Sequence, residues 1–258
     1  MIKKAEEAAY KKGYGSILCN YDDDMKKLKS YFNMLSEKKV EGIIISPFSI
    51  DITSVVKKIN IPIVFVADRP STVQTDFVTV NNNRAAHVAL RHLLDMGHKN
   101  IGFISGPKEN FVSKQRTESF IRATKEIGKG DIRYKIFHGN FHENGGYNAT
   151  IELINKFDNM TSIFSINSLS TIGLLRAFKE KGIKIPEDMS VITFDEMFYP
   201  CDTRITTVAQ PRELLGEKAI EVLINRIKNK TKNSYKEVIL EPYLIYGDSV
   251  KNLTNKRR

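Results

Sequence analysis

The order of short apolar runs and longer amphipathic segments is the feature of this 258-residue sequence that most restricts its fold. Most of the runs are apolar at consecutive positions, which is typical of strands that are covered on both faces. The predicted strands comprise residues 15–21, 40–46, 61–68, 100–106, 162–167 and 190–195. Because segments with helical periodicity separate these runs, the sequence predicts parallel α/β sheets with helices on both faces.

The helical segments carry recognisable ends. They include MKKLKSYFNMLSEKK, NRAAHVALRHLLDMGH and LSTIGLLRAFKEKG. Gly97 and Gly182 stand where a helix commonly ends in left-handed backbone, which glycine adopts without steric cost. Both positions therefore support the predicted helix boundaries.

Composition excludes several classes of protein. The formal charge of +10 comes from 40 Lys and Arg against 30 Asp and Glu, but the basic residues are spread along the chain. A nucleic-acid surface usually needs them clustered. No apolar run reaches the roughly 18 residues of a membrane span, and the first residues, MIKKAEEAAYKKGYGS, lack the apolar core of a signal peptide. We therefore expect a cytoplasmic protein with no membrane partner.

Three of the predicted strands end on polar side chains. The run SVITFD ends at Asp195, which is followed by Glu196, and the other two endings are Asp68-Arg69 and Asn167-Ser168. In open α/β sheets the ligand crevice lies beyond the carboxyl ends of the strands. The three endings together predict a pocket for a polar ligand.

The sequence contains none of the common catalytic or metal-binding motifs. It contains no phosphate-binding glycine loop, nucleophile elbow or zinc-protease motif. His138 and His142 are four residues apart, but Gly and Asn between them indicate a loop instead of a metal-binding helix. Cys19 and Cys201 are far apart and form no C-x-x-C pair. We expect no enzymatic activity, no cofactor and no metal.

Two long stretches resemble the effector-binding core of the lactose-repressor (LacI/GalR) family of bacterial transcription regulators. The first contains GHKNIGFISG followed by RTESFIRA, and the second contains IPEDMSVITFDE followed by TTVAQP and LG. The resemblance covers nearly the whole chain. It implies the periplasmic-binding-protein-like (type I) fold, with two doubly wound α/β lobes joined by three crossovers and a ligand in the cleft.

Carried over residue by residue, the resemblance implies a set of ligand contacts. Asp68 and Arg69 can hold adjacent hydroxyls through paired hydrogen bonds. Phe194 would offer an aromatic face to the C–H side of a sugar ring, and Val112 lies in a loop where relatives vary their contacts. The implied ligand-binding residues are Asp68, Arg69, Asn110, Lys114, Arg116, Asn167, Phe194, Asp195 and Gln210.

The chain departs from the family pattern at two places. Ser168 replaces the Asp that follows the family's Asn and often caps the next helix, a role that Ser can also take. Asn81-Asn82 stands where many relatives have Asp-Asn at a crossover. With Asn110 and Val112 in place of polar or cationic contacts, a sugar or sugar phosphate is the expected effector in preference to a purine.

The resemblance also predicts the domain organisation. The N-terminal lobe comprises residues 1–81 and 209–238, and the C-terminal lobe comprises residues 82–208 and 239–258. Relatives begin with a DNA-binding headpiece, a hinge helix and a first strand that this sequence lacks. The chain is therefore expected to be the core of a longer regulator that binds operator DNA through that headpiece.

We expect an effector-sensing and dimerisation domain that acts as a homodimer, in which effector binding alters the arrangement of the lobes. Two alternatives stay open at the level of sequence. One is an exported sugar-binding protein of a transporter, which shares this fold. The other is an α/β enzyme, for which no nucleophile or phosphate loop is found.

Overall fold

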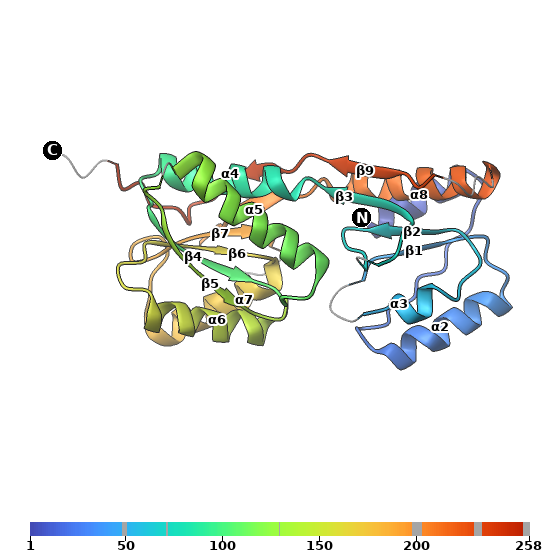
Figure 1. Cartoon of the computed structure of the whole chain (residues 1–258), viewed down its shortest axis with the longest axis horizontal. Helices are drawn as coiled ribbons and strands as arrows, with labels where there is room; N and C mark the ends of the chain where they lie inside the picture. Colours follow the sequence, from blue (N-terminus) through green and yellow to red (C-terminus); the bar gives the residue numbers. More distant parts are fainter. Residues whose placement is uncertain (48–50, 71, 129, 198–202, 230–233, 255–258) are drawn as a thin grey trace. The chain divides into compact units, whose positions relative to one another are not determined.

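The computed structural model describes residues 1–47, 51–70, 72–128, 130–197, 203–229 and 234–254. Two compact units divide the chain (Figure 1). Unit 1 comprises Met1–Val80 and Pro211–Leu240, and unit 2 comprises Asn81–Gln210 and Glu241–Arg258. The backbone therefore passes between the units three times, and the fold is the periplasmic-binding-protein-like α/β fold that the sequence predicts.

Unit 1 contains a parallel sheet with the strand order β1-β2-β3-β9. Its strands are β1 (Ile43–Ile45), β2 (Ile63–Val66), β3 (Asp76–Val80) and β9 (Glu237–Leu240), and its helices are α1 (Ile2–Tyr10), α2 (Met25–Glu37), α3 (Thr53–Val56) and α8 (Arg212–Asn229). Helix α8 packs on β1, β2 and β3, and α1 packs on α8.

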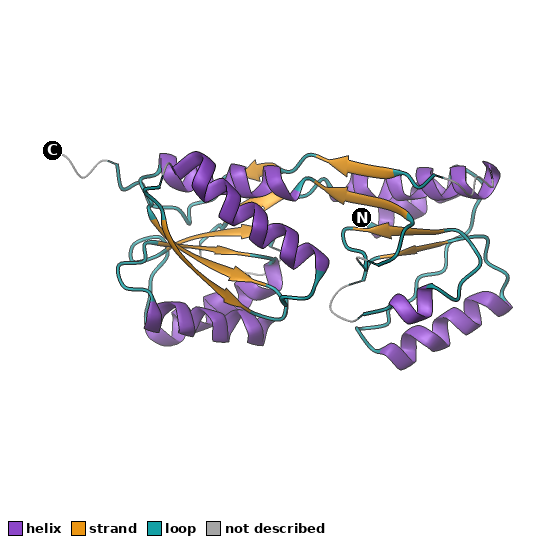
Figure 2. Cartoon of the chain, in the orientation of Figure 1, coloured by secondary structure: helices purple, strands orange, loops and turns teal. Residues whose placement is uncertain are grey.

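Unit 2 contains a sheet with the order β10-β8-β7-β6-β4-β5, in which only β10 is antiparallel to its neighbour. Helices cover both faces (Figure 2). The strands are β4 (Asn100–Ser105), β5 (Arg133–His138), β6 (Ser162–Ser165), β7 (Ser190–Phe194), β8 (Thr206–Ala209) and β10 (Tyr243–Ile245). The helices are α4 (Asn82–Asp95), α5 (Phe111–Gly128), α6 (Glu143–Lys156) and α7 (Ser168–Lys181).

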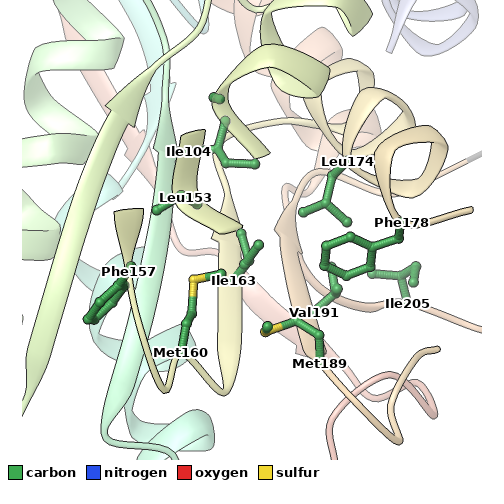
Figure 3. Close-up of a cluster of buried hydrophobic side chains, with 11 residues drawn as sticks. Ile104, Leu153, Phe157, Met160, Ile163, Leu174, Phe178, Met189, Val191 and Ile205 are labelled. Carbon is green, nitrogen blue, oxygen red and sulfur yellow. The ribbon is translucent and has the colours of Figure 1, made fainter. Parts of the chain in front are cut away.

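Apolar side chains of α6 and α7 form a core with one face of this sheet. Leu153, Leu174 and Phe178 from the helices lie against Ile163 and Val191 from the strands, all nearly inaccessible to solvent (Figure 3). The helices approach closely because Gly146 and Gly173 lie at their contact, where a Cβ on either would lie against the other helix's backbone. Interiors packed this closely hold the ends of the strands in fixed positions.

Most predicted strands and helices form, but residues 15–21 do not form a strand. The prediction was wrong because an extended segment becomes a strand only beside a partner, and in the described part of the chain the sheet ends at β1. Ile17 and Leu18 of this segment are 51% and 72% exposed. Gly97 and Gly182 have φ values of 86° and 68°, which confirms the predicted left-handed helix ends.

None of the helices in the described ranges combines the length and the hydrophobicity that crossing a membrane requires. Cys19 is a free thiol, and Cys201 lies outside the described residues.

A buried ion pair joins the sheet of unit 1 to α8. The Arg226 guanidinium donates two hydrogen bonds of 2.7 and 2.6 Å to the Asp76 carboxylate, whose side chain is 2% exposed. The backbone N–H of Lys236 donates to the same carboxylate at 2.7 Å. Because Asp76 begins β3 and Lys236 precedes β9, one carboxylate connects two strands and a helix.

Replacing Asp76 with Ala should destabilise unit 1 by about 3 kcal/mol, because it removes the buried carboxylate that accepts from the Arg226 guanidinium and from the Lys236 N–H. The midpoint of urea unfolding, followed by circular dichroism, measures the loss. Asp131→Ala is the control: it removes the exposed partner of Lys99 and should change stability by less than about 1 kcal/mol. Equal effects of the two substitutions would contradict this account.

A buried histidine fixes the C-terminal segment to the sheet of unit 2. His98 is 1% exposed and its Nε2 lies 3.0 Å from the carbonyl oxygen of Lys251, so Nε2 donates. Its Nδ1 lies 3.0 Å from the Thr161 hydroxyl. Burial lowers the pKa of His98 from its ordinary 6.5 to about 4. The ring is therefore neutral in the folded chain at neutral pH.

This pKa predicts a stability loss on acidification. Between pH 6.5 and about 4 the unfolded chain binds a proton at this position while the folded chain does not, so stability is complete above pH 6.5 and falls toward pH 4, by up to about 3 kcal/mol. The measurement is urea unfolding of the wild-type chain and of His98→Asn from pH 4 to pH 8. The difference between their unfolding free energies should shrink as the pH falls, and a constant difference would refute the assignment.

Candidate functional site

The pairing register of the strands in unit 2 places three polar residues side by side at the carboxyl end of its sheet. Ser165 of β6 pairs with Thr193 of β7, and Phe194 pairs with Val208 of β8. Parallel neighbours lie about 4.8 Å apart, so the residues just beyond these strands are close together. They are Asn167, Asp195 and Gln210. The predicted polar strand ends in unit 2 are thus adjacent in space.

Asp195 and Gln210 form a hydrogen-bonded pair at this edge. The Gln210 Nε2 donates to Oδ1 of Asp195, and the Asp195 N–H donates to the carbonyl of Val208 at 3.0 Å. Gln210 is 8% exposed, and within the described residues its buried Oε1 has no hydrogen-bond partner. A buried amide oxygen without a donor costs stability, and groups of this kind are found at functional sites.

The backbone at Asp195 is strained. Its φ is 76°, in the left-handed region that residues with a side chain rarely adopt. Such conformations cost of the order of 1–3 kcal/mol and cluster at functional sites. Ala67, just beyond β2 in unit 1, shows the same feature with a φ of 66°.

Arg116 of α5 lies against the end of β7. Its Cζ is 3.4 Å from the centroid of the Phe194 ring, and its Nη1 donates to the Ile166 carbonyl at 2.7 Å. Phe194 is 1% exposed, so in this structure its ring does not present an open face and one of its faces carries the guanidinium. This arrangement therefore leaves no open face of the Phe194 ring for the stacking on a sugar that the resemblance implies.

Asn167 has a structural role at the same edge. Its Oδ1 accepts from the Ser170 N–H at 2.8 Å and caps α7, and its Nδ2 donates to the Phe141 carbonyl at 2.9 Å. The cap is thus Asn167, whereas the sequence suggested that Ser168 could take this role. Ser168 is instead the first residue of the helix.

The predicted contacts Asn110, Val112 and Lys114 do not share a loop, and that expectation was wrong: Asn110 precedes α5, whereas Val112 and Lys114 lie in its first turn. The Asn110 Oδ1 accepts from the Ser113 N–H at 2.8 Å, so Asn110 caps the first turn of α5. Val112 is buried at 6% exposure, whereas Lys114 is exposed. Lys114 is therefore accessible to an anionic group.

Asp68 and Arg69 belong to unit 1. Asp68 is 8% exposed, and its Oδ1 accepts from the Arg69 N–H at 2.7 Å. The Arg69 guanidinium lies 3.6 Å from the Glu237 carboxylate and 4.5 Å from the centroid of the Phe77 ring. These contacts hold Arg69 on the sheet of unit 1.

Phe141 is a residue at the site that the sequence did not indicate. It is 5% exposed, has a φ of 68°, and its carbonyl accepts from Asn167. Its ring lies where a Cβ on Gly106 would be, so Gly106 makes room for it. The available signal was its place in the Gly/Asn loop HGNFH, which lies at the carboxyl end of a fourth strand, β5.

The two histidines of HGNFH lie on different elements: His138 is the last residue of β5, and His142 directly precedes α6. His138 Nδ1 is 3.0 Å from the Gly106 carbonyl oxygen. Within the described ranges, no three His, Cys, Asp or Glu side chains are placed to hold a metal ion.

Comparisons with known proteins agree with this geometry. Residues 90–250 match the model of the periplasmic binding protein-like domain. The chain is 33% identical to the HTH-type transcriptional repressor PurR of Mannheimia succiniciproducens and 32% identical to that of Photobacterium profundum, and each match covers 98% of this chain and 77% of the relative. These relatives are repressors, which does not favour the transporter alternative.

Solved structures show the same relationship. A LacI family regulator from Enterococcus faecium with bound ribose has a TM-score of 0.81 at 27% identity, over 98% of this chain and 94% of that one. A periplasmic binding protein/LacI regulator from Alkaliphilus metalliredigens in complex with D-xylulofuranose has a TM-score of 0.77 at 27% identity, over 96% and 92%. The chain belongs to the LacI family of transcriptional regulators and carries its effector-binding core.

Proposed function

We propose that this domain senses a neutral sugar, which binds at the carboxyl ends of β6, β7 and β8. The observation that supports this most is the buried Gln210 Oε1 beside the Asp195 carboxylate. Both groups accept hydrogen bonds, and a polyhydroxylated ligand supplies several donors at the spacing of adjacent carbons. An anionic ligand would bring its charge close to Asp195.

Relatives support the same class of ligand. The two solved relatives at 27% identity hold ribose and D-xylulofuranose. We infer that this chain takes a ligand of similar size and chemistry. On unit 2 we propose Asn110, Lys114, Arg116 and Asn167 as further contacts, with Phe194 supporting the Arg116 guanidinium that covers its ring. Asp68 and Arg69 are the proposed contacts on unit 1.

We further propose that the domain acts as a homodimer in a regulator of transcription. Family membership and the repressor relatives support the regulatory part of this proposal. An effector changes the affinity for operator DNA only as far as it binds one arrangement of the protein more tightly than the other. Analytical ultracentrifugation of the chain with and without sugar measures whether it sediments as a monomer or as a dimer.

A calorimetric screen tests the proposed ligand class. The ligands are D-ribose, D-xylulose, ribose 5-phosphate and hypoxanthine, titrated into the 258-residue chain. At least one neutral sugar should bind with a defined stoichiometry. If only hypoxanthine or only ribose 5-phosphate binds, the effector is not a neutral sugar and the proposal is wrong.

Asp195→Ala and Arg69→Ala should each weaken binding of that sugar more than about tenfold, because each removes a charged hydrogen-bonding group from the ligand. Arg69→Ala should change the melting temperature little, like the exposed control Asp131→Ala, because its pair with Glu237 is partly exposed. Asp195→Ala also leaves the buried Gln210 Nε2 without its acceptor, so it should lower the free energy of unfolding by about 1–3 kcal/mol. Unchanged calorimetric affinity in both variants would refute the assigned site.

A further inference from the structure

Asn82 links two helices at the point where the chain enters unit 2. It is the first residue of α4, two positions after unit 1 ends at Val80. Its Nδ2 donates to the Gln115 Oε1 at 2.9 Å, and its Oδ1 accepts from the Arg116 Nε at 3.1 Å. The side chain is 6% exposed, so both amide groups are satisfied inside the protein.

Three contacts together define the place of the Arg116 guanidinium. The Asn82 Oδ1 and the Ile166 carbonyl accept hydrogen bonds at its edge, and the Phe194 ring lies against its face. The second and third of these come from the ends of β6 and β7, where the proposed ligand binds. Of the three groups, only Asn82 comes from the segment where the chain first enters unit 2.

We propose that Asn82 is a positioning residue for effector binding: it fixes the plane of the Arg116 guanidinium without touching the sugar. This inference rests on the proposed function, in which Arg116 contacts the ligand. An arginine side chain has several rotatable bonds, and ordering it on binding costs free energy. A guanidinium that is already held in the free protein removes that cost.

The first test replaces the amide. Asn82→Leu keeps the volume but removes the acceptor, so D-ribose affinity in isothermal titration calorimetry should fall roughly tenfold. Asn82→Asp keeps an acceptor for the Arg116 Nε and should recover the affinity to within about threefold. A merely structural role would give no such rescue.

The second test uses Arg116→Met, which keeps a long side chain against Phe194 but removes the hydrogen bonds. If Asn82 acts through Arg116, Asn82→Leu should cause no further loss of D-ribose affinity in the Arg116→Met background. An equal loss in both backgrounds would overturn the proposal.

Asn83 provides a matched control. Its Oδ1 accepts from the Ser119 hydroxyl and from Arg122 Nη2, so it also connects α4 to α5 but does not contact Arg116. Asn83→Ala should leave D-ribose affinity unchanged. If Asn82→Leu lowers the melting temperature as Asn83→Ala does and leaves affinity intact, Asn82 only joins the helices and the proposal is wrong.

A ligand-free measurement separates this proposal from the proposed function. The Arg116 Nε–H should give a distinct signal in ¹⁵N NMR spectra of the wild-type chain and Asn82→Asp, and an exchange-averaged one in Asn82→Leu. An unchanged signal in Asn82→Leu would overturn the positioning role even where ribose binds. If Arg116→Met binds D-ribose as tightly as the wild-type chain, the proposed site itself fails.

Discussion

Parallel strands in a sheet end at the same edge, and the candidate site of this protein depends on that constraint. In unit 2 the register between β6, β7 and β8 brings together Asn167, Asp195 and Gln210, which are far apart in sequence. The core under α6 and α7 keeps these strands in place. Small changes in the core would therefore move the polar groups of the proposed ligand site.

The local backbone explains why the buried strand β7 ends on an acid. The β7 residues up to Phe194 are buried, and the left-handed backbone at Asp195 then turns the carboxylate toward Gln210. The strain at Asp195 and the buried Gln210 oxygen without a partner among the described residues both cost stability. Two such costs at one place are expected where binding, and not stability, determines the sequence.

Periodicity predicted part of the buried fold, but it missed the fully buried strands β3 and β8, whose threonines and neighbouring polar residues interrupt the apolar pattern. The apolar runs that became β2, β4, β6 and β7 are continuous because helices cover both faces of their sheets. The segment 15–21 contains a similar apolar run but forms no strand. A strand also needs a neighbouring strand to pair with, and a local sequence pattern does not show whether one is present. The short edge strands β9 and β10 were missed because their residues are partly exposed and carry little apolar pattern.

The site was predictable only in part, for a similar reason. Strand ends pointed to Asp195 and Asn167, but their partners depend on tertiary contacts. Asn167 uses its side chain to cap α7 and to hold Phe141, and Asn82 reaches Arg116 from another helix. Neither Phe141 nor Asn82 belongs to a motif that a single sequence displays.

In the proposed site, the ligand donates a hydrogen bond to the buried Gln210 Oε1. A crystal structure of the chain with its bound sugar tests this most directly. We expect a sugar hydroxyl within about 3 Å of the Gln210 Oε1 and another within hydrogen-bonding distance of the Asp195 carboxylate. A sugar bound elsewhere, with the Gln210 Oε1 still lacking a ligand donor, would contradict it.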